Sequence, residues 1–288
     1  MRRNRTIVVA DGREVGVCDY GSTKDVAVFW CHGGPGSRLE PAFLSEDAAA
    51  AGLRLVGFDR PGYGLSPPRP GRTIPDVVSD LIGVADALSI ERFVTVGVST
   101  GGAYALATAA LYPERVLGVV ACCSMTDMRF GPARSAMSVP HCRAVWDAPD
   151  RAAAISAAVQ AHGEGGSKML GGGMLAVLAP SDREMFGDPA WSETALADFP
   201  AMFTYGLEGY ADDRLADGAG WVDFDAGAIT CAVTVLHGAE DRMVDVVNAR
   251  HTAEIVPGAE LVVAEGLGHF SIERQILSEV TRLLVPGG

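Results

Sequence analysis

The stretch Phe93-Val94-Thr95-Val96-Gly97-Val98-Ser99-Thr100-Gly101-Gly102 decides the fold. Its first half is an apolar, β-branched run that predicts a buried strand over 92–98, and the Ala-rich run after it predicts a helix over 101–111. Small residues in the Gly-x-Ser-x-Gly pattern let the chain turn sharply from strand to helix, which leaves the serine exposed above the sheet. Ser99 is therefore the candidate nucleophile. The alternative is a glycine-rich turn with an incidental serine.

Similar strand and helix units surround this stretch. The first 30 residues predict a β-hairpin, followed by a buried strand that ends at Cys31. Alternating strands and helices indicate an α/β protein, with a mostly parallel sheet covered by helices on both faces. The further strands are predicted at 53–58, 116–123, 231–238 and 261–264, and the further helices at 74–88, 244–255 and 272–284.

The alternation breaks after Ser124 and resumes near residue 230. The segment between has no clear buried strand and looks helical over 151–161 and 191–205. Residues 125–225 carry 15 acidic and 7 basic side chains, which is most of the chain's net charge of −13. We expect a helical cap at 125–228 that divides the core into a first part, 1–124, and a second part, 229–288.

A catalytic serine needs a base that a third group orients. Asp241 follows the strand predicted at 231–238 after a short loop, and His269 follows the last strand in the loop GLGHFS. One helix and one strand separate the two residues, so both loops emerge at the same edge of the sheet. The order Ser99, Asp241, His269 is the one expected on this kind of sheet. Asp127, beyond the strand predicted at 116–123, is the alternative acid.

Acyl transfer also needs hydrogen-bond donors where the negatively charged tetrahedral intermediate forms. The glycine-rich run CHGGPGS, residues 31–37, follows the third predicted strand and lets the backbone approach a substrate. We expect the backbone N–H groups of Gly34 and Thr100 to form this oxyanion hole. Taken alone, the run would also fit a glycine-rich turn without a ligand.

Five motifs together resemble the α/β-hydrolase superfamily, in particular its cap-bearing serine hydrolases, the esterase and proline iminopeptidase-like branch. This resemblance implies an eight-stranded, mostly parallel sheet with a helical cap inserted after the sixth strand, and structural roles for Asp59 and Arg60. Iminopeptidases typically have tryptophan after the nucleophile, where this chain has Thr100. The motifs are HGGPGS at 32–37, DRPGYGLS at 59–66, GVSTGG at 97–102, HGAEDRMV at 237–244 and GHF at 268–270.

These features predict a serine hydrolase that needs no cofactor and no metal. We expect a carboxylic ester hydrolase that acts on a small neutral or apolar acyl substrate through an acyl-enzyme on Ser99. Two alternatives stay open: a proline iminopeptidase-like aminopeptidase or amidase, and a ligand-binding module with low turnover. The candidate pocket residues are Met125, Phe130, Trp146 and Phe203.

Composition restricts the partners. The chain has 288 residues, of which 48% are hydrophobic, so it can bury a sizeable core. A charge of −13 repels nucleic acid and anionic membranes, and no run is long enough for a signal peptide or a membrane helix. We expect a cytoplasmic protein with six reduced cysteines and a small-molecule substrate; a homodimer is left open.

Overall fold

A computed structural model describes residues 3–137, 140–169 and 178–285. Its centre is an eight-stranded sheet with the order β1-β2-β4-β3-β5-β6-β7-β8. β1 and β2 form the expected antiparallel hairpin, β2 is also antiparallel to β4, and the remaining pairs are parallel. The eight-stranded, mostly parallel sheet is thus confirmed. The strands are β1 (Arg3–Val8), β2 (Glu14–Tyr20), β3 (Val26–Cys31), β4 (Leu53–Phe58), β5 (Phe93–Val98), β6 (Val116–Cys122), β7 (Ala232–Gly238) and β8 (Glu260–Ala264).

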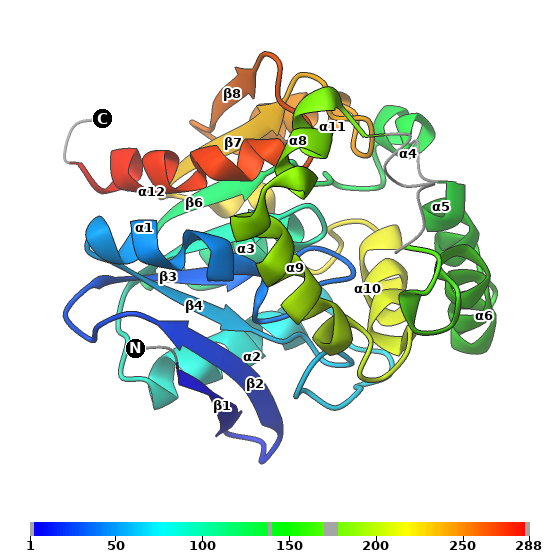
Figure 1. The fold of residues 1–288 in the computed structure, drawn as a ribbon, viewed down its shortest axis with the longest axis horizontal. Coiled ribbons are helices and arrows are strands. Elements are labelled where there is room, and N and C mark those ends of the chain that lie inside the picture. The colour runs from blue at the N-terminus through cyan, green and yellow to red at the C-terminus, as the bar shows by residue number, and fades with distance from the viewer. Residues whose placement is uncertain (1–2, 138–139, 170–177, 286–288) are drawn as a thin grey trace.

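Helices cover both faces of this sheet (Figure 1). One face carries α2 (Ile74–Ala87), α3 (Gly101–Leu111) and α11 (Val247–Ile255), and the other carries α1 (Ser45–Ala50) and α12 (Ile276–Leu284). Successive strand side chains point to opposite faces, so Phe29 joins the first apolar core and Trp30 the second. Burial on both faces explains why these strands are continuous apolar runs and do not alternate.

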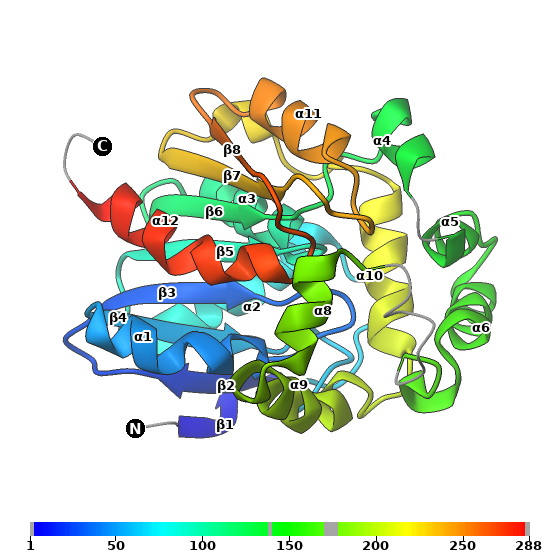
Figure 2. The same ribbon diagram turned by 45° about the horizontal axis from the view of Figure 1, so that its top comes forward.

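The segment between β6 and β7 contains helices and no strand among its described residues. Figures 1 and 2 show these helices beside the end of the sheet where the parallel strands finish. They are α4 (Gly131–Ala136), α5 (Pro140–Trp146), α6 (Arg151–His162), η2 (Glu164–Gly166), α8 (Pro180–Gly187), α9 (Pro189–Met202), α10 (Glu208–Gly218) and η3 (Ala226–Ala228).

Two predicted helix boundaries near the carboxyl end differ from the structure. The helix predicted at 244–255 begins only at Val247, because the Asp245 carboxylate accepts the Val247 N–H at 2.8 Å and holds the chain in a turn before it. The helix predicted at 272–284 is a 3-10 turn, η4 (Ser271–Gln275), followed by α12. A further 3-10 turn, η1 (Glu40–Leu44), follows the glycine-rich loop after β3.

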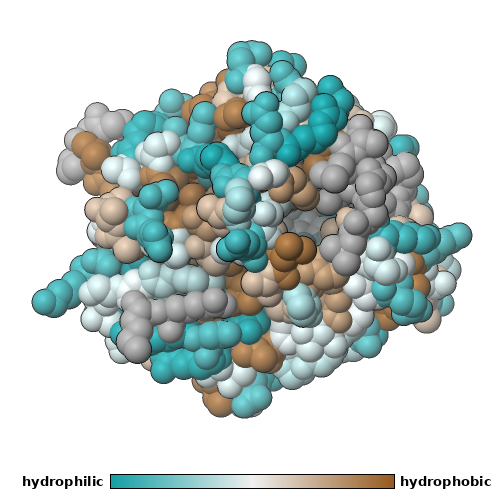
Figure 3. All heavy atoms as spheres, in the orientation of Figure 1, coloured by the Kyte–Doolittle hydropathy of each residue, from teal (hydrophilic) through white to brown (hydrophobic). Residues whose placement is uncertain are grey.

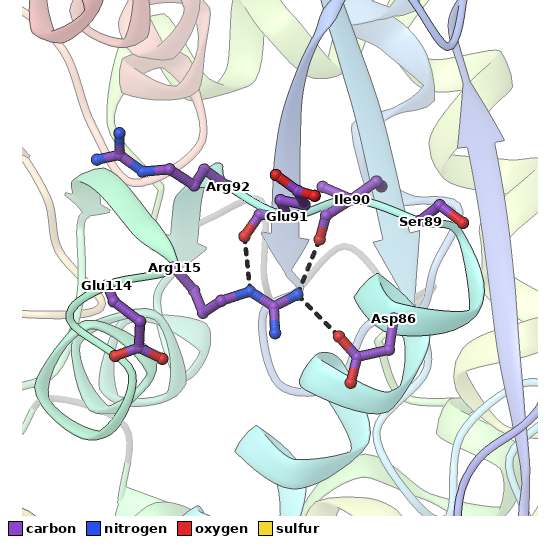
Figure 4. A pocket seen from close by; sticks show the side chains of 7 residues that line it. All are labelled: Asp86, Ser89, Ile90, Glu91, Arg92, Glu114 and Arg115. Atoms are coloured by element: carbon purple, nitrogen blue, oxygen red, sulfur yellow. Dashed lines mark hydrogen bonds and ion pairs between the residues drawn. The ribbon is translucent and has the colours of Figure 1, made fainter.

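A surface hollow lies at the other end of the sheet, beside the first residues of the inner strands β5 and β6 (Figure 4). The Arg115 guanidinium crosses it and donates to the carbonyl oxygens of Ile90 and Glu91 and to the Asp86 carboxylate, at 2.6–2.8 Å. These bonds fasten the turn between α2 and β5, so we assign this hollow a structural role.

Among the described residues, no helix is both long and apolar enough to cross a membrane.

The close contact between α3 and the end of β3 gives a stability prediction. A Cβ on Gly101 would lie 1.9 Å from the Cys31 carbonyl oxygen, whereas a Cβ on Gly131, also the first residue of a helix, would meet nothing within 4 Å. Gly101→Ala should therefore lower the free energy of unfolding by about 1–3 kcal/mol, and Gly131→Ala should leave it nearly unchanged. Urea unfolding of both variants measures this; equal stabilities would contradict the close contact between Gly101 and the end of β3.

Candidate active site

Ser99 lies at the sharp turn between β5 and α3. Its φ is +52°, an uncommon conformation for a residue with a side chain. The turn is fixed because the Ser99 N–H donates to the Cys122 carbonyl at 2.9 Å, and the Ser99 carbonyl accepts from Gly102 at 3.2 Å and Met125 at 3.4 Å. A Cβ on Gly97 would lie 2.4 Å from the Gly101 carbonyl oxygen, which explains the small residues on both sides of the serine.

The structure brings His269 and Asp241 together. The His269 Nδ1 and the Asp241 Oδ2 are 2.7 Å apart, and the Asp241 side chain has no solvent exposure. The other carboxylate oxygen of Asp241 accepts the N–H groups of Met243 at 2.8 Å and Val244 at 2.9 Å. Asp127 instead binds Arg129. The contact to the imidazole is therefore made by Asp241 and not by the alternative acid.

Burial and charge act in opposite directions on this pair. Burial of the His269 ring disfavours its protonation, but the adjoining Asp241 carboxylate prevails and raises the pKa of His269 well above its usual 6.5. Burial likewise opposes ionisation of Asp241, but the imidazole lowers the pKa of this carboxyl below its usual 3.8. Asp241 is therefore ionised and can orient the ring.

Sequence reasoning missed the residue that holds the histidine loop. Asp182, at the start of α8, is buried and accepts the backbone N–H groups of His269, Phe270 and Ser271 at 2.8–3.0 Å. A Cβ on Gly268 would lie 2.3 Å from this carboxylate, so the glycine is needed for its approach. An isolated aspartate in a helical segment has no motif that would have revealed this contact.

Ser99 and His269 line one cavity of about 780 Å³. Gly34 and Thr100 lie in the same wall, and α9 supplies a large share of the remaining wall residues. In the orientation of Figure 3, hydrophobic residues gather near α9, beside more hydrophilic surface. The structure therefore places the candidate nucleophile, the imidazole and both expected oxyanion residues around one space.

Of the four expected pocket residues, only Met125 is among the described residues of this wall. Phe130 stacks on the His251 ring with centroids 3.8 Å apart. The Trp146 Nε1 donates to Asp217 at 2.7 Å. Phe203 packs with Phe199 at 4.9 Å. Phe130 thus packs against α11, whereas Trp146 and Phe203 pack within the inserted segment. An aromatic residue in such a segment can serve either packing or a pocket, and residue type alone does not separate the two.

The backbone orients the Gly34 N–H group. A peptide group is planar, with its N–H and C=O pointing in opposite directions. The Gly33 carbonyl is fixed by the Arg60 Nη2 at 2.7 Å and lies 2.7 Å from the His32 Nδ1, so the Gly34 N–H must point the other way. The Gly33 N–H donates to the Glu40 carboxylate at 2.9 Å. The Gly34 N–H has no acceptor among the residues that the structure describes.

The direction of the Thr100 N–H group is fixed in the same way. The Ser99 carbonyl is held by two donors, so the Thr100 N–H, in the same peptide group, has a fixed direction and no acceptor within the described chain. Arg214 of α10 donates to the Thr100 Oγ1 at 2.6 Å. A Cβ on Gly34 would lie 2.6 Å from that oxygen, so the two candidate oxyanion residues are in contact.

Arg60 connects this region to the inserted helices. Its guanidinium has no solvent exposure, donates to the carbonyls of His32 and Gly33, and pairs with Asp213 of α10 at 2.7 Å. Burial alone would raise the pKa of Asp213, but Arg60 and Arg72 lower it below its usual value. The structural role expected for Arg60 is consistent with these contacts.

Three carboxyl groups form another part of the cavity wall: the buried Asp198 and Glu273, and Glu40, which is partly exposed. Burial raises the pKa of Glu40 to about 7, against the hydrogen bond from Trp30, and that of Asp198 to about 7, against the hydrogen bond from Ser37. Burial also raises the pKa of Glu273 well above its usual value. These groups are therefore largely or partly protonated at neutral pH.

Comparisons with known proteins agree with this architecture. A model of the alpha/beta hydrolase fold matches residues 26–274. The chain is 35% identical over 108 residues to a proline iminopeptidase of Neisseria gonorrhoeae, covering 35% of this chain and only 34% of that protein. It is 25% identical over 279 residues to the 2-hydroxymuconate semialdehyde hydrolase of Pseudomonas putida, covering 92% and 87%. The enol-lactonase structure from Burkholderia xenovorans LB400 shares the fold, with a TM-score of 0.71, 20% identity and coverage of 97% and 99%.

The contact between Asp241 and His269 predicts the titration of the ring. The His269 imidazole should lose its proton only well above pH 6.5, and Asp241→Asn should lower its pKa because burial then acts without the opposing carboxylate. Asp127→Asn, which alters a carboxylate paired with Arg129, should leave the value unchanged. NMR titration measures the pKa of His269 in the wild-type protein and in both variants. An unchanged His269 pKa in Asp241→Asn would contradict the pairing.

Proposed function

The chain belongs to the alpha/beta hydrolase fold family, and on that basis we propose that it is a serine hydrolase that cleaves carboxylic esters. The observation that carries this proposal is the meeting of Ser99 and the His269–Asp241 pair at one cavity. We also propose that residues 125–228 act as a cap, which is supported by the cavity-wall residues of α8, α9 and α10.

In the proposed reaction the neutral form of His269, which prevails above its raised pKa, removes the proton of the Ser99 hydroxyl as the Ser99 oxygen attacks the ester carbonyl carbon. The protonated imidazole then returns this proton to the leaving alcohol, which gives an acyl-enzyme. A water molecule then gives a proton to His269 and attacks the acyl group, and the imidazolium returns that proton to the Ser99 oxygen as the acid leaves. Asp241 stabilises the imidazolium in both steps, which the 2.7 Å contact to Nδ1 supports.

The tetrahedral intermediate has a negatively charged oxygen that needs donors already in place. Two observations support this role for the N–H groups of Gly34 and Thr100: neither has an acceptor among the described residues, and the carbonyl of each peptide group is held by other donors. Loss of one such donor typically costs about 10²–10³ in rate. The proposal therefore assigns stabilisation of this oxygen to the backbone.

The cavity wall supports a small neutral or apolar acyl group. Its wall contains Phe186, Trp191, Leu196 and Phe199. Burial raises the pKa of Glu40 and of Asp198 to about 7, so neither carboxyl is fully ionised at neutral pH. A cationic substrate group would gain less from these carboxyls than from ionised ones.

An aminopeptidase or amidase for substrates with an ammonium group is the second candidate, and one observation favours it. Glu273 is 4% exposed, faces the cavity, and has no hydrogen bond or ion pair from its carboxyl group among the described residues. An ammonium ion beside Glu273 would favour its ionised form and bind to it. Substitution of Glu273 therefore distinguishes an esterase from an aminopeptidase or amidase.

Removal of the nucleophile gives the first test. Ser99→Ala should lower kcat for p-nitrophenyl butyrate by about 10⁴-fold or more, as loss of a catalytic serine does elsewhere. Ser192→Ala removes a hydroxyl that lines the same cavity and should change kcat only a few-fold. Steady-state kinetics with circular dichroism as a folding check measure this. Normal turnover by Ser99→Ala would exclude the proposed acyl-enzyme.

A comparison of substrates separates the two candidates. The wild-type protein should hydrolyse p-nitrophenyl acetate and butyrate faster than proline p-nitroanilide. Glu273→Gln imitates the protonated carboxyl and should retain ester turnover. Rapid anilide cleavage without ester cleavage, abolished by Glu273→Gln, would favour the aminopeptidase instead.

A further inference from the structure

A buried thiol lies beside the proposed base. Cys123 follows directly after β6, has a φ of +41°, and has no solvent exposure. Its N–H donates to the Leu236 carbonyl of β7 at 2.7 Å, which fixes the residue between two strands. All six cysteines are free thiols. The reaction proposed above makes no use of Cys123.

This thiol completes a set of three metal-binding side chains. One ligand atom from each of Cys123, Asp241 and His269 lies within 4.8 Å of the others, and this is the one such group found among the described residues. Sulfur, nitrogen and carboxylate oxygen are the donors that Zn²⁺ takes in tetrahedral sites, at about 2.0–2.3 Å. Those bond lengths place neighbouring donors roughly 3.5 Å apart, so small side-chain rotations would bring all three to one ion.

The charges of the set also suit a divalent cation. A bound thiolate and the Asp241 carboxylate supply two negative charges, and the imidazole binds as a neutral ligand. The thiol proton and one ring proton of the imidazolium are released to solvent, and the bound imidazole keeps its single proton on the nitrogen that does not contact the cation. Mg²⁺ and Ca²⁺ prefer oxygen ligands alone, whereas a thiolate selects softer ions.

We propose that Cys123, Asp241 and His269 form an inhibitory site for Zn²⁺ or Cd²⁺. A cation on Nδ1 leaves the ring proton on Nε2, and a cation on Nε2 occupies the basic lone pair; in both cases the imidazole cannot accept the serine proton. His269 is the member of the cluster that lines the cavity, so a cation that enters from the cavity reaches the imidazole first. Inhibition rests on the proposed function, whereas cation binding does not.

Two measurements on the full-length protein test this site. Cd²⁺ titration followed by the ultraviolet absorption of the cadmium–thiolate bond should give one site per chain, and Zn²⁺ should displace the ion. The same ions should inhibit p-nitrophenyl butyrate hydrolysis reversibly, with recovery after EDTA, and Mg²⁺ should not. Ser99→Ala, which lacks turnover, should still bind Cd²⁺.

Cys123→Ala identifies the ligand. Loss of a residue that only hydrogen-bonds to a metal ligand typically weakens metal binding about 10–100-fold. Cys123 would be a direct ligand, so Cys123→Ala should weaken Cd²⁺ binding at least as much. Cys142→Ala is the matched control, since Cys142 is another buried free thiol that lines the cavity but lies outside the cluster. Inhibition is compared with each variant's own rate without metal, and circular dichroism verifies folding.

Several outcomes would overturn the proposal. Absence of a cadmium–thiolate band in the wild-type protein, or an equal band in folded Cys123→Ala, would exclude the site. Binding without inhibition of an active protein would exclude its inhibitory role. A wild-type protein that binds Cd²⁺ through Cys123 but cleaves no ester would contradict the proposed function while keeping the metal site, so the two failures are distinguishable.

Discussion

The buried pairing of Arg60 with Asp213 is the interaction on which the site depends most. Neither side chain has any solvent exposure, so each charge would be strongly destabilising without the other. The same guanidinium holds the carbonyls of His32 and Gly33, and Asp213 belongs to α10 of the inserted segment. Folding of that segment and the direction of the Gly34 N–H are therefore coupled through one charged group.

Two carboxylates hold His269 and its loop, as the Arg60–Asp213 pair holds the glycine-rich loop after β3. Asp241 fixes one ring nitrogen of His269, and Asp182 fixes the backbone of the histidine loop from α8. Residues of the inserted segment thus contact both the glycine-rich loop after β3 and the loop that carries His269. This arrangement explains how a segment that contains neither Ser99 nor His269 can set the geometry around both, and why several of its acidic residues are buried in spite of their charge.

Much of the fold could be predicted from the sequence because its signals are local. The strand at 53–58 and the helix at 101–111 match the structure at both ends, since apolar runs and glycine-rich turns mark them directly. The pairing of Asp241 with His269 followed from chain order and strand spacing. Asp182 acts through contacts between distant segments, and a single aspartate in a helical segment gives no pattern from which such contacts can be inferred. The motif at 59–66 indicated a structural role for Arg60 but not its pairing with Asp213, which lies 153 residues further along the chain. The place of Glu273 in the cavity wall likewise has no sequence signal.

The central claim is that Ser99 is a nucleophile activated by His269 and oriented through Asp241. Intact-protein mass spectrometry with peptide mapping, after reaction with a fluorophosphonate, tests it most directly. The account predicts one adduct per chain on Ser99, formed far more slowly in His269→Ala and in Asp241→Asn. A folded wild-type protein that forms no adduct, or forms it on another serine, would contradict the account.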